Sequence, residues 1–350
     1  MAYYNEVEEK NLDKIEEQLS HFPEYVREYI NSIQFTTTTK TRIGYLWDLE
    51  TFFDYVADVK NLPREEISTE VLDTLDKHFF DEYLRYLSKY EKNGHVYTNQ
   101  IPALRRKLTS LKALFHYLFL DNKMKSCEIT KVNTPKLRKK EIVYLDDEET
   151  NEFLAEVSSP TAKSPHHQKY LETQSVRDKT LTQLLYSTGI RVSECVGLNI
   201  QDINLEKCFM KIVRKGNKEA TIYLSDEMVD ILRIYMEHRK TIIPVAGHEY
   251  ALFLSSQRKR LTQRSIERIV KKYAVNAIPQ KHITPHKLRA SYATAMNEKT
   301  DGNLLLVSSL LGHESVRTTQ AYVVQSERRK EEVRNILSKK PQNDNAEERG

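Results

Sequence analysis

The sequence is poor in cysteine and has no long apolar segment. Its three cysteines, Cys127, Cys195 and Cys208, are an odd number at wide spacings, which fits neither a disulfide framework nor a zinc site. No run approaches the roughly 18 to 20 apolar residues that a membrane span requires. The acidic N-terminal stretch lacks the charged-then-apolar order of a secretory signal. We therefore expect reduced structural cysteines and a cytoplasmic protein with no membrane partner.

Metal-ligand patterns are missing as well. The adjacent His166 and His167 stand in a predicted loop with no further ligand at a recognisable spacing, so we interpret them as surface residues. No internal repeats are visible either. At 350 residues the chain exceeds a typical single domain, and its 39% hydrophobic residues suffice for ordinary cores, so we expect two domains.

The charge that is present is unevenly placed, although the net charge is only +4. Residues 1–35 contain eight acidic and three basic side chains, whereas residues 101–145 contain eleven basic and three acidic ones. The second segment is a candidate surface for a polyanion. Charge alone does not distinguish it from an ordinary solvated helix face.

The N-terminal part of the chain has the apolar spacing of amphipathic helices. The helix expected over residues 41–59 has one apolar stripe, formed by Ile43, Leu46, Leu49, Phe52, Phe53 and Val56. Residues 36–39 are threonines that can cap this helix. A second helix is plausible over residues 75–90.

A third helix is expected over residues 99–120, after a break at 91–98 that contains Gly94, and Thr98 is its expected cap. Its apolar stripe is formed by Ile101, Leu104, Leu108, Leu111, Phe115 and Leu118. The basic residues that lie largely off this stripe are Arg105, Arg106, Lys107 and Lys112. Such a basic face often docks on DNA, although a plain solvated surface is as common.

A change in composition divides the chain, because periodicity fails between Lys123 and Lys140. We expect a helical domain over 1–125, a basic linker over 126–145, a second domain over 146–335 and a tail over 336–350. Asp146 or Asp147 is the expected cap of the first helix in the second domain, with acids at the positive end of the helix dipole.

The second domain combines helices with a small β-structure. A helix over 178–189 ends at Gly189, which can serve as its left-handed cap. Residues 208–224 have the pattern of two short strands around Gly216 and Asn217, a good hairpin signal. Thr284 and Pro285 suit the cap and first turn of a later helix. The predicted fold is therefore mainly α with a small β-sheet or hairpin.

Six residues of the second domain could carry chemistry, and each alone is a weak signal: Arg191, Lys215, His286, Arg289, His313 and Tyr322. Taken singly, such residues are usually structural. Together they form a cationic set without a carboxylate cage, which suits a phosphate rather than a divalent metal. An arginine fork can bind two phosphate oxygens and stabilise a pentacovalent transition state without Mg²⁺.

A tyrosine in such a set could act as a nucleophile. Its ordinary pKa is about 10, so a histidine must take its proton or a dense positive field must favour the phenolate. A lysine on a mobile turn could protonate the departing oxygen. Nucleophile, phosphate clamp and acid are all present, and no cofactor is expected.

These residues lie in five ordered motifs, TGIRVSE, RKGNK, HKLR, LLGH and TTQAY. The motifs resemble the signature of the tyrosine recombinases, the phage-integrase superfamily, with a spacing similar to that of the Xer type. The resemblance covers about residues 146–335. It implies a helical SAM-like core-binding domain followed by a mixed α/β catalytic domain, which form a C-shaped clamp on DNA.

The resemblance also implies a function and a role for each residue. The protein would be a site-specific recombinase that cuts and rejoins DNA through a 3′-phosphotyrosyl intermediate, with Xer-like chromosome dimer resolution as its role. Arg191 and Arg289 would bind the scissile phosphate, and His313 would hydrogen-bond it. Glu194 would orient catalytic side chains.

The remaining roles concern proton transfer. His286 would accept the proton of Tyr322, and Lys215 would be the general acid for the 5′-hydroxyl leaving group. Two neighbouring positions depart from the family pattern. Ala290 stands where another histidine is frequent, and Val323 replaces a small polar residue, but neither is a catalytic position.

For the N-terminal domain, the resemblance implies that helices over 45–56 and 99–120 lie against adjacent major grooves, with the linker crossing phosphates. The candidate DNA-binding residues are Arg105, Arg106, Lys107, Lys112, Lys136, Arg138, Lys139 and Lys140. Replacing Arg105, Arg106 and Lys107 together is predicted to weaken DNA binding and to flatten its salt dependence.

The implied partners are a double-stranded recombination site and further copies of the chain, two on a site and four in a synapse. The segment after Tyr322 could form a helix that presents Val333, Ile336 and Leu337. Family members commonly dock this helix on the neighbouring protomer, and packing on its own domain is the alternative. A DNA translocase or a paralogous recombinase is a further candidate partner.

Other functions stay open from the sequence. Integration or excision of a mobile element uses the same active site. A type IB topoisomerase shares the phosphotyrosine chemistry, although the compact helical N-terminal domain and the KGNK hairpin favour recombination. A non-catalytic DNA-binding protein would not need Tyr322, and a metal-dependent integrase would need a carboxylate triad that we do not find.

Overall fold

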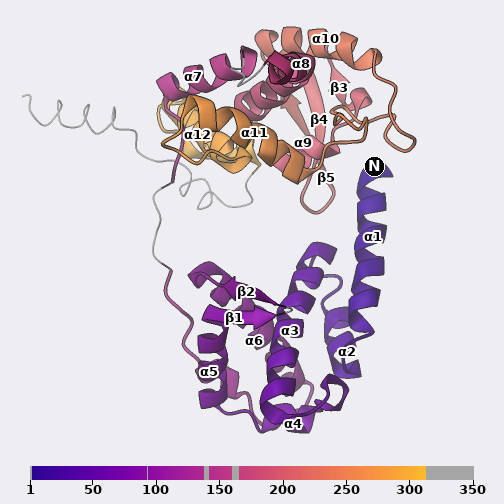
Figure 1. Cartoon of the computed structure of the whole chain (residues 1–350), viewed down its shortest axis with the longest axis vertical. Coiled ribbons are helices and arrows are strands. Elements are labelled where there is room, and N and C mark those ends of the chain that lie inside the picture. Colours follow the sequence, from indigo (N-terminus) through magenta and orange to yellow (C-terminus); the bar gives the residue numbers. More distant parts are fainter. Residues whose placement is uncertain (1, 93, 138–141, 160–164, 313–350) are drawn as a thin grey trace, which may run out of the picture. The chain divides into compact units, whose positions relative to one another are not determined.

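The computed structural model describes residues 2–92, 94–137, 142–159 and 165–312. Contacts within the chain divide it into two units, Met1–Lys140 and Glu141–Gly350. Both units are mainly helical with a small antiparallel sheet (Figure 1), so the expected fold class is confirmed. None of the helices described is both long and apolar enough to span a bilayer.

The first unit contains a helical core in which α3 packs against α1 and α6 (Figure 1). Its elements are α1 (Ala2–Leu19), α2 (Glu24–Ser32), α3 (Thr39–Lys60), the 3-10 turn η1 (Arg64–Glu66), α4 (Thr69–Asp73), α5 (Lys77–Ser88), β1 (Lys89–Lys92), β2 (His95–Thr98), α6 (Ile101–Leu120) and the 3-10 turn η2 (Glu128–Lys131). The stripe predicted for residues 41–59 is buried along α3. Thr38 caps α3 by accepting a hydrogen bond from the Thr41 amide, as expected of this threonine run.

Aromatic side chains fill the middle of the first unit. The Phe52 ring lies edge-on to Tyr83 and Phe115, with ring centroids 5.2 and 5.9 Å apart. Each fully buried side chain of this size contributes about 1.5–3 kcal/mol. Ile129 and Val132, which the sequence places in the linker, also belong to this core. The core therefore fixes α3, α6 and the segment that follows α6 relative to one another.

The helices are interrupted at residues 91–98 as expected, but by a hairpin that the sequence did not predict, and the expected Thr98 cap is wrong. β1 pairs with β2 in antiparallel register, and Gly94 at the turn has φ of 73°. These short strands alternate too little in polarity to stand out in the sequence, yet Tyr90 stacks on Tyr97 across the pair. Thr98 therefore lies in a strand, and Gln100 rather than Thr98 precedes the first turn of α6.

The second unit is built around α8, which packs against α7, α10 and α12. Its elements are α7 (Asp147–Ser158), α8 (Pro165–Thr188), α9 (Val192–Gly197), the 3-10 turn η3 (Ile200–Asp202), β3 (Ile203–Asn204), β4 (Phe209–Arg214), β5 (Lys218–Tyr223), α10 (Asp226–Lys240), α11 (Gln263–Ala277), α12 (Pro285–Lys299) and α13 (Leu304–Leu311). The strands form an antiparallel sheet in the order β3-β4-β5, and β4 lies against α9. The strand ends thus come close to the helix that follows Arg191.

Turn chemistry sets several ends of these elements as the sequence predicts, although α8 begins at Pro165, so the loop expected around His166 and His167 is wrong. Asp146 caps α7 through the Glu149 amide, and the Glu149 side chain accepts from the Asp146 amide in return. Gly189 ends α8 with φ of 60°, and Thr284 caps α12. The expected hairpin is also confirmed, since Arg214 pairs with Lys218 across a turn in which Gly216 and Asn217 have positive φ.

Candidate active site and DNA-binding surface

Arg191 stands at the start of α9, where a buried carboxylate fixes it. The Glu194 side chain is 3% exposed, and its Oε1 accepts a hydrogen bond from Arg191 Nη1 at 2.9 Å. Its Oε2 accepts from the Arg191 backbone N–H at 2.8 Å. The Arg191 side chain itself is 37% exposed. Glu194 therefore orients a guanidinium that a ligand can still reach from solvent.

Arg289 lies on α12 and is buried. Its Nη1 donates to the Gly189 carbonyl, and its Nη2 donates to the Leu311 carbonyl at 2.8 Å. Gly189 follows the last residue of α8, and Leu311 is the last residue of α13. The carbonyl end of a helix carries a partial negative charge, which favours a cation there. Arg289 thus joins three helices whose ends carry the TGIR, HKLR and LLGH motifs.

Gly189 is required at its position for two reasons. Its φ of 60° is in the left-handed region that side chains disfavour. A Cβ at this position would also overlap the ring of Tyr292 on α12. Glycine therefore allows α8 to end beside α12, and the chain to reach Arg191 two residues later.

His286 lies one turn before Arg289 on the same helix and remains in contact with solvent. Partial burial lowers the pKa of His286 below its ordinary value, and the positive charges of Arg289 and Arg191 lower it further. The charges of both arginines therefore reach this ring. At neutral pH the imidazole is uncharged and can accept a proton.

Lys215 is exposed at the start of the β4–β5 turn. The residue before it, Arg214, was not predicted as part of the site, because a pair of basic residues at a strand end is commonly a solvent-exposed pattern. Arg214 Nη2 donates to the Leu310 carbonyl at 3.2 Å. Burial lowers the pKa of Arg214, while Glu194 raises it and Arg191 lowers it. Arg214 is thus within electrostatic range of the Arg191–Glu194 pair.

The described part of the site is therefore a cationic cluster around one buried carboxylate. It brings together the sequence-predicted Arg191, Glu194, His286 and Arg289, and it adds Arg214. Such a cluster suits an anion like a phosphodiester. Within the described residues, no group of three His, Cys, Asp or Glu side chains could hold a metal ion. His313, Tyr322 and the helix expected after Tyr322 lie outside those residues.

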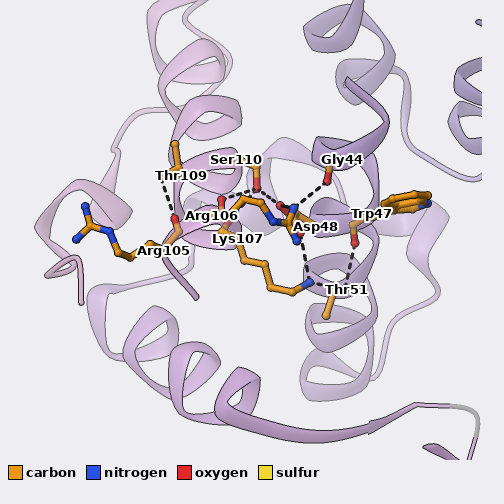
Figure 2. A network of polar contacts seen from close by, with 9 residues as sticks. All are labelled: Gly44, Trp47, Asp48, Thr51, Arg105, Arg106, Lys107, Thr109 and Ser110. Atoms are coloured by element: carbon orange, nitrogen blue, oxygen red, sulfur yellow. Dashed lines mark hydrogen bonds and ion pairs between the residues drawn. The ribbon is translucent and has the colours of Figure 1, made fainter. Parts of the chain in front are cut away.

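In the first unit, the basic helix α6 is joined to α3 through Asp48. Figure 2 shows Arg106, Lys107 and Ser110 converging on this carboxylate, whose side chain is 1% exposed. Lys107 Nζ lies 3.3 Å from Asp48 Oδ1. Arg106 Nη1 pairs with Oδ2, and Ser110 Oγ donates to the same oxygen at 3.1 Å. Asp48 is therefore a buried acid that pairs with two cations of α6.

Lys107 differs from the expected solvent-facing position. It is buried, and its Nζ also donates to Thr51 Oγ1 at 3.2 Å. Burial lowers the pKa of Lys107, and Asp48 opposes that shift. Asp48 was not predicted as part of this surface, although it stands next to the apolar stripe of residues 41–59. Arg106, by contrast, keeps 52% of its side chain exposed.

The other basic residues of α6 hold the segment that follows it. Arg105 points away from the Asp48 network (Figure 2), and its Nη1 donates to the Pro135 carbonyl at 2.6 Å. Lys112 Nζ donates to the Val132 carbonyl at 2.8 Å. Lys136 is exposed. The other linker candidates lie outside the described residues: Arg138, Lys139 and Lys140.

Known proteins are similar to this chain in sequence and in fold. Residues 143–329 match the model of the phage integrase family. Tyrosine recombinase XerD of Staphylococcus epidermidis is 31% identical over 300 residues, which cover 85% of this chain and 92% of the relative. Tyrosine recombinase XerC of Syntrophus aciditrophicus is 29% identical over 319 residues, which cover 89% of this chain and 94% of that relative.

A solved structure of XerH site-specific recombinase, in a post-cleavage complex with palindromic difH substrate, matches with a TM-score of 0.63 at 20% identity. This match covers 86% of the present chain and 80% of the XerH chain. At that level of identity, the likeness shows a shared fold.

Proposed function

We infer that this chain, which belongs to the phage integrase family, is a tyrosine recombinase that cuts and rejoins DNA at specific sites. The observation that supports this most strongly is the pair of bonds from Arg289 to the carbonyls of Gly189 and Leu311. These bonds gather three motifs that are far apart in the sequence. Phosphoryl transfer by these residues requires that the three motifs lie at one site.

Arg191 and Arg289 are the proposed ligands of the scissile phosphate. Glu194 fixes one guanidinium, and two helix-terminal carbonyls fix the other, before any DNA arrives. Donors fixed in advance stabilise the charge of a pentacovalent transition state without reorganising during the reaction. His313 would add a hydrogen bond to the same phosphate.

Proton transfer completes the proposed reaction. His286, held neutral by its surroundings, accepts the phenolic proton of Tyr322, and the phenolate oxygen attacks phosphorus. The bond from phosphorus to the 5′ oxygen breaks, and Lys215 donates a proton to that oxygen. The product is a 3′-phosphotyrosine, which a 5′-hydroxyl of another duplex can reverse without ATP.

The Xer type is the proposed biological setting, with chromosome dimer resolution in the cytoplasm as the role. Its support is that two Xer relatives align over more than nine tenths of their own length. Integration or excision of a mobile element is the second candidate, because it needs the same active site. A DNA translocase or a paralogous recombinase would be an additional partner in the first case.

We propose that residues 1–125 form the core-binding domain, 126–145 the linker, and 146–335 the catalytic domain, and that the two domains clamp DNA. The DNA-facing surface would use α3 and α6. The residues near phosphates would be Arg105, Arg106, Lys112, Lys136, Arg138, Lys139 and Lys140. Lys107 would contribute by holding Asp48 and Arg106. Two copies would bind a site and four a synapse, joined through the helix after Tyr322.

A suicide substrate tests the catalytic proposal. A set of duplexes carrying candidate sites, nicked so that the cleaved 5′ fragment diffuses away, is mixed with the full chain in EDTA. Wild type should form a covalent protein–DNA adduct, and Tyr322→Phe should form none. Tyr250→Phe is the matched control, because this tyrosine is exposed on the second unit and should leave the adduct unchanged.

Each alternative function gives a different result. Relaxation of plasmids that carry no candidate site would favour a type IB topoisomerase. Tight binding without an adduct on any site would favour a non-catalytic DNA-binding protein. An adduct that Tyr322→Phe still forms would refute the assignment of the nucleophile.

A further inference from the structure

Arg214 connects the β4–β5 hairpin to the carboxyl end of α13. It is the last residue of β4, and its Nη2 donates to the carbonyl of Leu310 at 3.2 Å. Its guanidinium also lies directly against Gly312, because a Cβ at that glycine would overlap Nη1 and Cζ of Arg214. Gly312 is the C-cap of α13, with φ of 62°. One side chain therefore bridges two elements of the site.

Stability alone does not account for this arrangement. Arg214 Nε is buried and has no hydrogen-bond partner among the described residues. Leaving a buried donor of a charged group without a partner is costly. The charge of Glu194 and the negative end of the α13 dipole offset part of this cost, whereas the nearby charge of Arg191 adds to it. An uncharged side chain would fill this space at a lower free-energy cost of burial, if packing were the only role of the residue.

The position of Arg214 along the chain indicates what the bridge is for. The next residue is Lys215, the proposed general acid, and Gly216 and Asn217 follow in left-handed conformations. A lysine on so short a turn has many conformations unless the strand before it is fixed. Fixing that strand reduces the entropy lost in the transition state.

We propose that Arg214 is a positioning residue, which fastens the β4–β5 turn to the end of α13 and so holds Lys215 in reach of the leaving oxygen. This inference rests on the proposed function, because it requires Lys215 to be the general acid. It assigns Arg214 no contact with DNA.

A pair of substrates separates this role from simple structural support. One suicide duplex carries the ordinary phosphodiester, and the other carries sulfur in place of the bridging 5′ oxygen. A thiol has a pKa of about 8.5, so the thiolate leaves without a general acid. Arg214→Gln should slow cleavage of the ordinary duplex by about 10- to 100-fold and cleave the sulfur duplex at nearly the wild-type rate.

Two controls make the result specific. Lys215→Ala should show the same pattern with a larger loss on the ordinary duplex. Arg233→Gln should match wild type on both substrates, since Arg233 is exposed and pairs only with Asp230, at 2.7 Å, among the described acids. Arg214→Lys should recover part of the rate, because it keeps the charge but offers a single donor point.

The outcomes separate the inference from the proposed function. Equal slowing of Arg214→Gln on both duplexes, or no slowing on either, would overturn the role of Arg214 while leaving recombination intact. Absence of a wild-type adduct on either duplex would overturn the proposed function. If Lys215→Ala cleaves the sulfur duplex as slowly as the ordinary one, Lys215 is not the general acid. The inference about Arg214 would then also be wrong.

Amide hydrogen exchange provides a readout that needs no DNA. In the full chain, Arg214→Gln should speed exchange both in the β4–β5 turn and in the last turn of α13, whereas Arg233→Gln should change neither. Exchange that speeds up in only one of these two segments would contradict the bridge.

Discussion

The two units each contain a buried carboxylate that pairs with an arginine, yet they use it differently. In the first unit, Asp48 binds the buried Lys107 as well as Arg106. In the second unit, Glu194 binds Arg191 and the Arg191 amide. The number of buried cations makes the difference. Asp48 holds two helices together, whereas Glu194 holds one partly exposed guanidinium ready for a ligand.

The comparison implies opposite consequences of removing each acid. Without Asp48, the ammonium of Lys107 would be buried beside Thr51 without this counter-charge, and the free energy of unfolding would fall. Without Glu194, water could still solvate the exposed part of Arg191, so the fold would suffer less. The position of the guanidinium, and hence catalysis, would suffer more.

The largest effect is expected at Asp48. Asp48→Asn should lower the free energy of unfolding by about 3 kcal/mol, because it breaks a buried charge pair. Urea unfolding of the full chain, followed by circular dichroism, measures this. The control Asp230→Asn removes an exposed acid paired with Arg233 and should cost about 0–1 kcal/mol. Equal losses in the two variants would break the comparison.

Removing the charge of Glu194 should affect the cleavage rate more than the free energy of unfolding. Glu194→Gln keeps the shape but weakens the hold on Arg191, so adduct formation should slow by about 10- to 100-fold. The free energy of unfolding should fall by only about 1 kcal/mol, since neutral hydrogen bonds replace charged ones. Single-turnover cleavage and urea unfolding give the two numbers, with exposed Glu237→Gln as the control. A large loss of stability with a normal cleavage rate would mean that Glu194, like Asp48, mainly stabilises the fold.

The pH dependence sharpens the contrast between the units through His286. Protonation of His286 removes the base, and its pKa is lowered, so cleavage should persist below pH ~6.5 and then fall about tenfold per pH unit. The unfolded chain binds this proton more readily than the folded chain, so stability should decline as the pH falls from the ordinary pKa to the lowered one.

Adduct formation measured across this pH range tests His286. His286→Gln should be slow at every pH and should lack the acid limb. His78 in the first unit is 79% exposed, and His78→Gln should retain the wild-type profile. An acid limb that survives in His286→Gln would assign the titrating base to another residue.

The smallest effect is expected within the basic helix. Arg106→Ala should weaken DNA binding a few-fold and reduce the salt slope by about 1, because one exposed phosphate contact is lost. Lys107→Met should lower stability but leave the slope unchanged, because the buried lysine makes no phosphate contact of its own. Binding measured at several salt concentrations distinguishes them. Equal slopes for both variants would mean that Lys107 does reach DNA.

Local rules in the sequence account for much of the fold. The spacing of Ile43 to Val56 predicted α3, and the acids at Asp146 and Asp147 predicted the start of α7. Gly216 and Asn217 predicted the second hairpin. These signals depend on residues close together in the chain, so they can be read without the tertiary structure.

Long-range features could not be read in the same way. The position of Lys107 depends on Asp48, which lies on another helix, and the pattern within α6 contains no trace of it. The bridge from Arg214 to Leu310 likewise joins residues that are 96 positions apart. Arg191, His286 and Arg289 could be named as a set from their motifs, but not the carbonyls that hold Arg289.

The two carbonyl bonds of Arg289 have a consequence for the newly made chain. They join α12 to the end of α8, 100 positions earlier, and to the end of α13, 22 positions later. The position of Arg289 therefore depends on the ends of α8 and α13 having packed against α12. A copy in which these three segments are apart carries the same side chains, but its Arg289 lacks the two carbonyl acceptors that hold it in place. The arginine clamp is in this way a product of tertiary folding and not of any single motif.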